Sequence, residues 1–133
     1  MTTSGTDDTL PAPETIPVVA IEQVRAFAAA SGDSNPIHIS PYAARAAGFD
    51  APLLHGMFIA GRFETFLERF GSYHIAELRV NFVRPVPVGS ALTISSRRIA
   101  GPDLRLRLLA NIAGGALVAV AEARLAATSE PAQ

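Results

Sequence analysis

The stretch GMFIAGRFETFLERF, residues 56–70, decides the fold that this sequence predicts. Its large apolar residues recur every three or four positions, so they fall on one stripe of an α-helix about four turns long. They are Ile59, Phe63, Phe66, Leu67 and Phe70. The charged residues lie off this stripe, and Gly71 follows as a terminator. The pattern predicts a helix with one side that must be covered.

The chain after residue 71 alternates between apolar and polar residues, as strands with one buried face do. Leu78, Val80 and Phe82 alternate with Glu77, Arg79 and Asn81, and Leu104, Leu106 and Leu108 alternate with Arg105 and Arg107. Further strands are expected over 92–94 and 117–125, with turns at 101–103 and 114–115. A helix followed by such strands predicts an α+β fold, in which an antiparallel sheet packs around helix 56–70.

The first third of the chain predicts shorter elements. Residues 1–15 are rich in Thr, Asp and Pro and are expected to be flexible, as is the tail 129–133, which leaves a single domain over 16–128. We expect a short strand over 16–20 and a helix over 21–30 that Gly32 ends. After an irregular loop, Ser40 and Pro41 open a short helix that ends at Gly48.

Composition excludes several classes of function. The 133 residues are 49% hydrophobic and 17% charged, which supplies an ordinary core, and the net charge of −1 argues against binding to nucleic acid. There is no cysteine, so disulfides, thiolate nucleophiles and cysteine metal sites are excluded. The N-terminus has no signal-peptide pattern, and no apolar run is long enough to cross a membrane. We therefore expect a cytoplasmic protein without a membrane partner.

Residues 31–38, SGDSNPIH, hold the strongest candidates for chemistry. Pro36 fixes its own φ and biases Asn35 toward extended backbone, so the segment is expected to bend rather than continue as a helix. Such a loop brings Asp33 and His38 to one side, where Asp33 accepts a hydrogen bond from a water that His38 orients or deprotonates. The alternative is that Asp33 caps a turn and His38 is a buried structural histidine.

Gly56 opens the long helix, where unpaired N–H groups and the helix dipole favour an oxygen that gains negative charge. A glycine there allows a carbonyl to approach closely, so its N–H is a candidate oxyanion donor; the alternative is an ordinary glycine at a helix start. His55 is expected to make a structural hydrogen bond, and His74 to be exposed. Because the three histidines show no metal-ligand spacing, we expect no metal.

Two further charged residues have an ordinary and a functional interpretation. Glu64 lies on the polar side of the long helix, where a solvated carboxylate is the default, but it is also a candidate base for a hydrolytic site. Arg84 follows a predicted strand and is interpreted as a surface residue rather than a phosphate ligand.

Three segments resemble, in order, the MaoC-like (R)-specific enoyl-CoA hydratases. They are FAAASGDSNPIH at 27–38, APLLHGM at 51–57 and FVRPVPVG at 82–89. The resemblance spans about 18–127 and implies a hot-dog fold, a long central helix wrapped by a curved antiparallel sheet. It also implies a homodimer that binds an acyl thioester near the subunit interface, with coenzyme A entering as part of the substrate and no separate cofactor.

Carried over residue by residue, the resemblance makes Asp33 and His38 the catalytic pair and Gly56 the oxyanion glycine. Asn35 matches the motif asparagine of the substrate site, which we interpret as a residue that shapes the loop. The implied reaction is attack of a water on the β-carbon of a trans-2-enoyl thioester, or the reverse dehydration of a (3R)-hydroxyacyl thioester. The chain departs from the family at Glu64, where relatives often carry a small hydroxyl residue, and at Ser90, where an acidic residue is common.

Three hypotheses follow. The leading one is an (R)-specific enoyl-thioester hydratase or dehydratase that prefers coenzyme A to a carrier protein as the thiol. The second is a hot-dog acyl-CoA thioesterase that uses Glu64 as its base. The third is a non-catalytic subunit that binds an acyl thioester or a partner; Asp33, Asn35 and His38, all present, weigh against it.

Overall fold

A computed structural model of the protein describes residues 10–128. The predicted tail 129–133 and most of the predicted N-terminal segment lie outside this range. The elements follow the order β1 (Glu14–Ile16), α1 (Ile21–Ser31), the 3₁₀-helix η2 (Pro36–His38), α2 (Pro41–Ala46), α3 (Gly56–Leu67), β2 (Tyr73–Phe82), β3 (Leu92–Ile99), β4 (Leu104–Ile112) and β5 (Leu117–Ala127).

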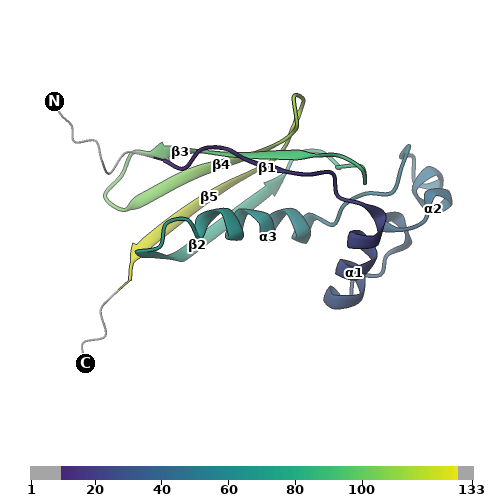
Figure 1. The fold of residues 1–133 in the computed structure, drawn as a ribbon, viewed down its shortest axis with the longest axis horizontal. Coiled ribbons are helices and arrows are strands. Elements are labelled where there is room, and N and C mark those ends of the chain that lie inside the picture. The colour runs from purple at the N-terminus through teal and green to yellow at the C-terminus, as the bar shows by residue number, and fades with distance from the viewer. Residues whose placement is uncertain (1–9, 129–133) are drawn as a thin grey trace.

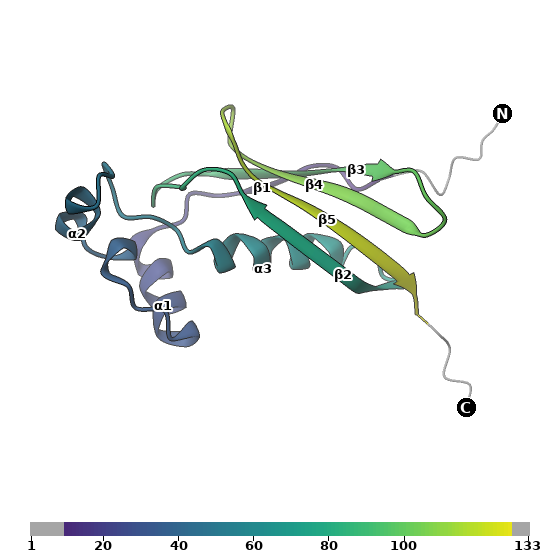
Figure 2. The same cartoon turned by 180° about the vertical axis from the view of Figure 1, so that it is seen from behind.

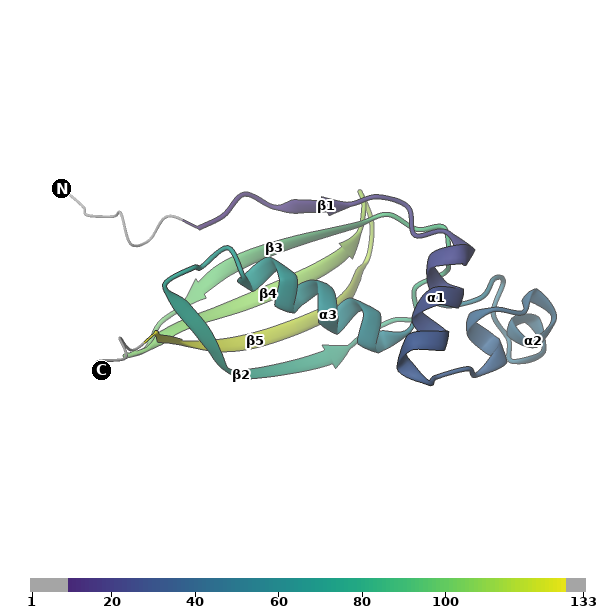
Figure 3. The same ribbon diagram turned by 60° about the horizontal axis from the view of Figure 1, so that its bottom comes forward.

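The five strands form one antiparallel sheet in the order β1-β3-β4-β5-β2. The sheet curves around α3, which lies along one of its faces, while α1 and α2 gather beyond the N-terminal end of α3 (Figures 1 and 3). Seen from behind, β2 and β5 cross in front of α3 (Figure 2). This is the α+β hot-dog architecture that the sequence predicted.

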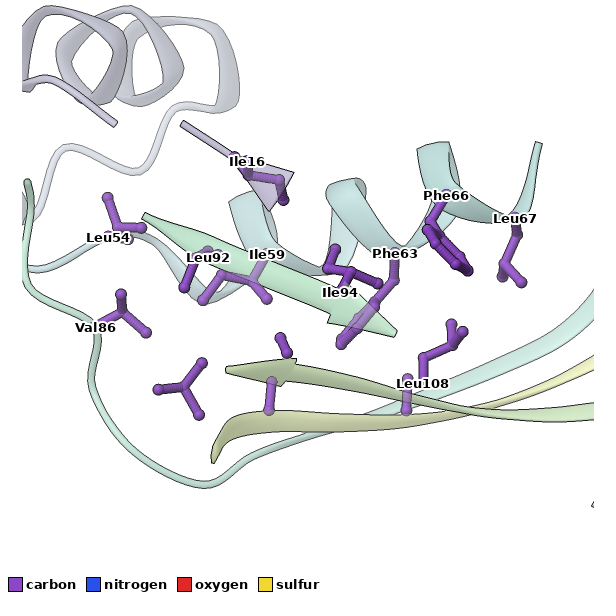
Figure 4. Packing of buried hydrophobic residues seen from close by; sticks show 14 of the residues in the cluster. Ile16, Leu54, Ile59, Phe63, Phe66, Leu67, Val86, Leu92, Ile94 and Leu108 are labelled. Carbon is purple, nitrogen blue, oxygen red and sulfur yellow. The ribbon is translucent and has the colours of Figure 1, made fainter. Parts of the chain in front are cut away.

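The core lies between α3 and the concave face of the sheet. Phe63 and Phe66 are fully buried, and the labelled side chains of Ile94 and Leu108 reach toward the helix from the strands (Figure 4). The buried positions of β5 opposite the helix include Ala119, Ala121 and Ala123. Because these side chains are single methyl groups, they leave depth for the two phenylalanine rings, each worth about 1.5–3 kcal/mol when buried.

The N-terminal edge strand begins earlier than predicted. The expected strand over 16–20 is β1 at Glu14–Ile16, so the ordered domain includes residues assigned to the flexible segment. The Arg62 side chain on α3 donates a hydrogen bond to Glu14 (2.9 Å), and Arg69 donates to the main-chain oxygen of Ala12 (3.0 Å). Composition alone could not show this attachment, because both arginines lie about fifty residues away in the sequence.

Two other details differ from the sequence-based expectation. Helix α3 ends at Leu67 instead of Phe70, and the amide of Phe70 donates to Leu67 in a turn (3.0 Å). Phe82 keeps its place in the apolar alternation of β2 but is 50% exposed, because β2 is an edge strand. None of the helices within residues 10–128 has the length and hydropathy needed to span a bilayer.

Candidate active site

Residues 20–51 form an excursion that leaves the sheet layer and contains α1, η2 and α2. This excursion carries the candidate catalytic residues Asp33 and His38. Both ends of this excursion are attached by backbone hydrogen bonds to one segment, residues 86–90. The bonds join Val19 to Gly89 and Ser90 (3.0 and 3.4 Å), Leu54 to Val86 (2.8 Å) and Val88 to Pro52 (2.7 Å). The excursion is therefore held at the N-terminal end of α3 (Figure 1).

A series of side chain to backbone hydrogen bonds shapes the loop after α1. Gly32 ends the helix at φ 82°, in the left-handed region that favours glycine. The amide of Asp33 donates to Ser31 Oγ (3.2 Å), and the amide of Asn35 donates to Asp33 Oδ1 (3.3 Å). Asn35 Oδ1 then accepts from the amide of Ile37 (3.1 Å). Asn35 thus caps η2, with Pro36 at its first position, and turns the chain so that His38 faces back toward Asp33.

His38 is buried, and its hydrogen bonds assign its protons. Its Nδ1 lies 2.8 Å from the carbonyl oxygen of Leu53, which can only accept, so Nδ1 carries the hydrogen. In the neutral ring Nε2 therefore has a lone pair, and this atom lies 3.6 Å from Oδ2 of Asp33. A lone pair and a carboxylate oxygen do not bond each other, but together they can accept both hydrogens of one water molecule. The structure brings the predicted pair together.

His55 lies directly against this pair. Its ring stacks on that of His38 with centroids 3.7 Å apart and planes 21° apart, and its Nε2 lies 3.0 Å from the main-chain oxygen of Asp33. The ring is 2% exposed, and Phe27 contacts it at 4.8 Å between centroids. The sequence predicted a structural hydrogen bond but not the contact with His38, because no local pattern relates residues so far apart in the chain.

Gly56 is the first residue of α3, and its N–H has no acceptor among residues 10–128, as the geometry of a helix start requires. The ring of Phe82 packs against it. A Cβ added at position 56 would meet Phe82 Cζ at 3.1 Å, closer than side chains normally approach. The glycine therefore leaves room for this ring in addition to exposing a free donor.

A cavity of about 230 Å³ adjoins Gly56. Apolar side chains supply most of its walls, and Arg84 is the charged residue among them. The lining residues are Leu54, Gly56, Ile59, Phe82, Val83, Arg84, Pro85 and Val86. A free N–H beside an apolar space suits a carbonyl that continues into a hydrocarbon chain.

Asp33, His38 and His55 each offer one possible ligand atom, and these atoms lie within 4.8 Å of one another. The sequence did not indicate this cluster. A metal ion lies close to the plane of every imidazole that binds it, and the two stacked ring planes are so nearly parallel that they meet far outside bonding distance. The orientation of the two rings does not suit a metal ion bound by both of them, and the absence of a metal stays a prediction.

The other candidate residues lie apart from this cluster. Glu64 is exposed, and eight residues of helix place it about 12 Å along the axis from Gly56. It has no ion-pair partner within the described part of the chain. His74 is exposed on β2, as predicted, and Arg84 is exposed at the mouth of the cavity.

Comparison with known proteins gives a consistent result. Residues 3–104 match the MaoC like domain. The (R)-specific enoyl-CoA hydratase of Aeromonas caviae is 34% identical over 109 residues, which cover 76% of this chain and 81% of that protein. The fatty acid synthase subunit beta of Gibberella zeae is 39% identical over 83 residues, 59% of this chain but only 4% of that much longer protein.

The fold agrees with the sequence match. The solved (R)-hydratase from A. caviae, described as involved in PHA biosynthesis, superposes with a TM-score of 0.78 at 29% identity, over 88% of this chain and 93% of that one. A curved sheet around one helix, the match over residues 3–104 and the similarity to a hydratase of nearly the same length agree with one another. This chain belongs to the MaoC-like hydratase and dehydratase family, with its hot-dog fold.

Proposed function

We propose that the protein is a hydro-lyase that adds water to a trans-2-enoyl-CoA to give a (3R)-hydroxyacyl-CoA, or catalyses the reverse dehydration. The observation that carries this proposal is the 3.6 Å between His38 Nε2 and Asp33 Oδ2, two acceptors that can share one water, and the N–H of Gly56 is the candidate oxyanion donor. Similarity to an (R)-specific enoyl-CoA hydratase supports the same chemistry.

In the proposed reaction a water donates one hydrogen to each acceptor. Its oxygen adds to the β-carbon as His38 Nε2 takes one of its protons, and the electron pair of the double bond moves through the α-carbon onto the thioester oxygen. The proton then passes from Nε2 to the α-carbon on the same side, and the carbonyl re-forms. One water is consumed, and both side chains return to their starting states.

Gly56 has the second role in this proposal. The thioester oxygen gains negative charge as the enolate forms, and a preorganised N–H at a helix N-terminus stabilises such charge. The cavity of about 230 Å³ beside Gly56 supplies an apolar space for the acyl chain. Asn35 contributes by shaping the loop that holds Asp33 and His38.

The test is loss of enoyl absorbance when crotonyl-CoA meets the purified protein, with Asp33→Asn and His38→Ala beside it. Asp103→Asn is the control, because it changes an exposed side chain in the turn between β3 and β4, outside both the site and strand β2. We expect turnover to a (3R) product that falls about 100- to 10,000-fold in the two site variants and is unchanged in the control. Lack of turnover with short and long enoyl-CoA chains would contradict the proposal, and free thiol released from acyl-CoA would indicate the thioesterase.

We also propose that the active form is a cytoplasmic homodimer. Strand β2 is an edge strand of ten residues, and an edge of this length is a template for pairing with a second chain. Exposed apolar side chains lie at its end and at the start of α3, namely Phe82, Val83 and Met57. Light scattering after size exclusion is expected to give twice the chain mass of 14.0 kDa, about 28 kDa; a monomer at assay concentrations would contradict this.

A further inference from the structure

We propose that His55 is a positioning residue of the reaction: it holds Asp33 and His38 in their working geometry and fixes both relative to Gly56. The inference rests on the proposed function. It assigns to His55 a role through other residues, without contact to the substrate.

The first contact acts on Asp33. His55 Nε2 lies 3.0 Å from the main-chain oxygen of Asp33, which can only accept, so His55 donates from Nε2. Asp33 otherwise sits in an exposed loop, with its side chain 54% accessible. A donor from a residue that is 2% exposed anchors that loop to the interior of the molecule.

The second contact acts on His38. The two imidazoles stack at 3.7 Å between centroids, so the flat face of His55 limits how far the His38 ring can tilt. The hydrogen bond from Nδ1 to Leu53 fixes one edge of the His38 ring, and the stack fixes one face. With both constraints present, the His38 ring is held in one orientation, in which its Nε2 faces the Asp33 carboxylate.

The position of His55 in the chain connects the Asp33–His38 pair to Gly56. It is the N-cap residue of α3 and is bonded directly to Gly56, the proposed oxyanion donor. Phe27 of α1 supports its ring at 4.8 Å and in turn meets Phe58 of α3 edge to face at 5.7 Å. The distance between the acid–base pair and the Gly56 N–H is thus set through one rigid, supported ring.

These contacts explain why an imidazole is required. The main-chain oxygen of Asp33 accepts a hydrogen bond from the Nε2 edge of the His55 ring, and the His38 ring stacks on the flat face of the same ring. Glutamine supplies a donor without the ring, and phenylalanine supplies the ring without the donor. His55→Gln and His55→Phe therefore separate the two contributions.

The experiment measures kcat and KM for crotonyl-CoA in both variants, with Asp103→Asn as the control. Because a displacement of the reacting groups by about 1 Å costs about 100-fold in rate, we expect kcat to fall about 10- to 100-fold in each variant. KM is expected to stay within about twofold, because His55 does not line the cavity. Turnover by both variants within twofold of the wild type would overturn the inference while leaving the hydratase intact.

Imidazole nitrogen NMR provides a readout independent of activity, and the chain has only three histidines to assign. In the wild type we expect His38 protonated at Nδ1 and His55 at Nε2; the opposite tautomer on either ring overturns the inference even if no variant folds. In the variants we expect the His38 signals to shift toward a mixture of tautomers. Unchanged His38 signals, with kcat lost only in proportion to the folded fraction, would mean a structural role. A wild type without turnover but with these tautomers would contradict the proposed function alone.

Discussion

The carbonyl oxygen of Leu53 accepts a hydrogen bond from His38 Nδ1 at 2.8 Å, and its amide donates to the main-chain oxygen of Ile37 at 3.0 Å. One residue thus holds both His38 and the residue before it. Leu53 is itself paired with Pro87 in an isolated β-bridge, so the orientation of the imidazole is transmitted to the sheet layer through backbone groups. Backbone contacts of this kind do not depend on the identity of the side chain at position 53.

Substitution of Gly56 by alanine is expected to separate packing from chemistry. The added Cβ would meet Phe82 Cζ at 3.1 Å, but Phe82 is half exposed and can move, so we expect a loss of stability of only about 1 kcal/mol. The methyl group narrows the space beside the free N–H, and kcat is expected to fall about tenfold or more. Denaturant unfolding and crotonyl-CoA kinetics measure the two effects.

The double variant Gly56→Ala/Phe82→Leu is the control for this prediction. The smaller side chain at position 82 relieves the clash, so stability is expected to recover while kcat remains low. Recovery of both quantities would show that Gly56 serves the packing of Phe82 and has no separate role toward the substrate.

Glu14→Gln is expected to loosen the N-terminal edge strand. The Glu14 carboxylate lies 2.9 Å from Arg62 Nη2 and 3.8 Å from Arg69 Nη2, and its side chain is 20% exposed. Loss of this partly buried ion pair is expected to lower the free energy of unfolding by about 1 kcal/mol, a fall of about 4 °C in Tm. Glu22→Gln, at an exposed position on α1, is expected to leave Tm unchanged; equal effects of the two variants would rule out a specific link between β1 and α3.

Phe63→Ala tests whether α3 is the center of the core. Phe63 has no exposed surface and lies between the helix and the sheet, so its removal is expected to cost about 3–5 kcal/mol through lost burial and the cavity left behind. Tyr42→Ala, at a site 77% exposed on α2, is the comparison and is expected to change stability by less than about 0.5 kcal/mol. Comparable losses in both variants, measured by denaturant unfolding, would contradict this assignment of the core.

Glu77→Gln is expected to change how stability depends on pH. The hydrogen bond and charge of Arg79, followed by the charges of Arg124 and Arg105, lower the pKa of Glu77 from its ordinary value of 4.5. A carboxyl whose pKa is lower in the folded state stabilises the fold above the unfolded pKa, and this contribution disappears as the pH falls through the folded pKa. The wild type is therefore expected to have the higher Tm at pH 7, and the difference in Tm should shrink as the pH falls below the unfolded pKa of 4.5. A difference in Tm that stays constant as the pH is lowered would point to packing instead of charge.

Much of the fold could be predicted from the sequence, because local periodicity reports which side of an element is buried. The stripe on residues 56–70 correctly placed Phe63 and Phe66 in the core, and the alternation of Leu106 and Leu108 gave the inner face of β4. The turn at Gly114 and the cap at Ser40 were also identified from local chemistry. Such signals lie within a few residues of one another and need no knowledge of the rest of the chain.

What the sequence did not indicate depends on contacts between distant segments. The stack of His38 on His55 joins residues seventeen positions apart, and the attachment of Glu14 to Arg62 spans forty-eight. The exposure of Phe82 follows from the position of β2 at the sheet edge, which alternation within one strand cannot report. For the same reason His55 was assigned a local role, whereas its partners come from the loop after α1.

The attachment of residues 20–51 at both ends to segment 86–90 has a consequence for how the protein can vary. A stretch that leaves and rejoins the fold at neighbouring points resembles a loop insertion, and that short proline-containing segment holds both of its ends by backbone hydrogen bonds. Changes on the outer face of the sheet can then accumulate without disturbing the acid and the imidazole. Segment 86–90 holds both ends of this stretch against the sheet layer. Substitutions in it are therefore expected to shift Asp33 and His38 and to lower activity, although the segment contributes no group to proton transfer.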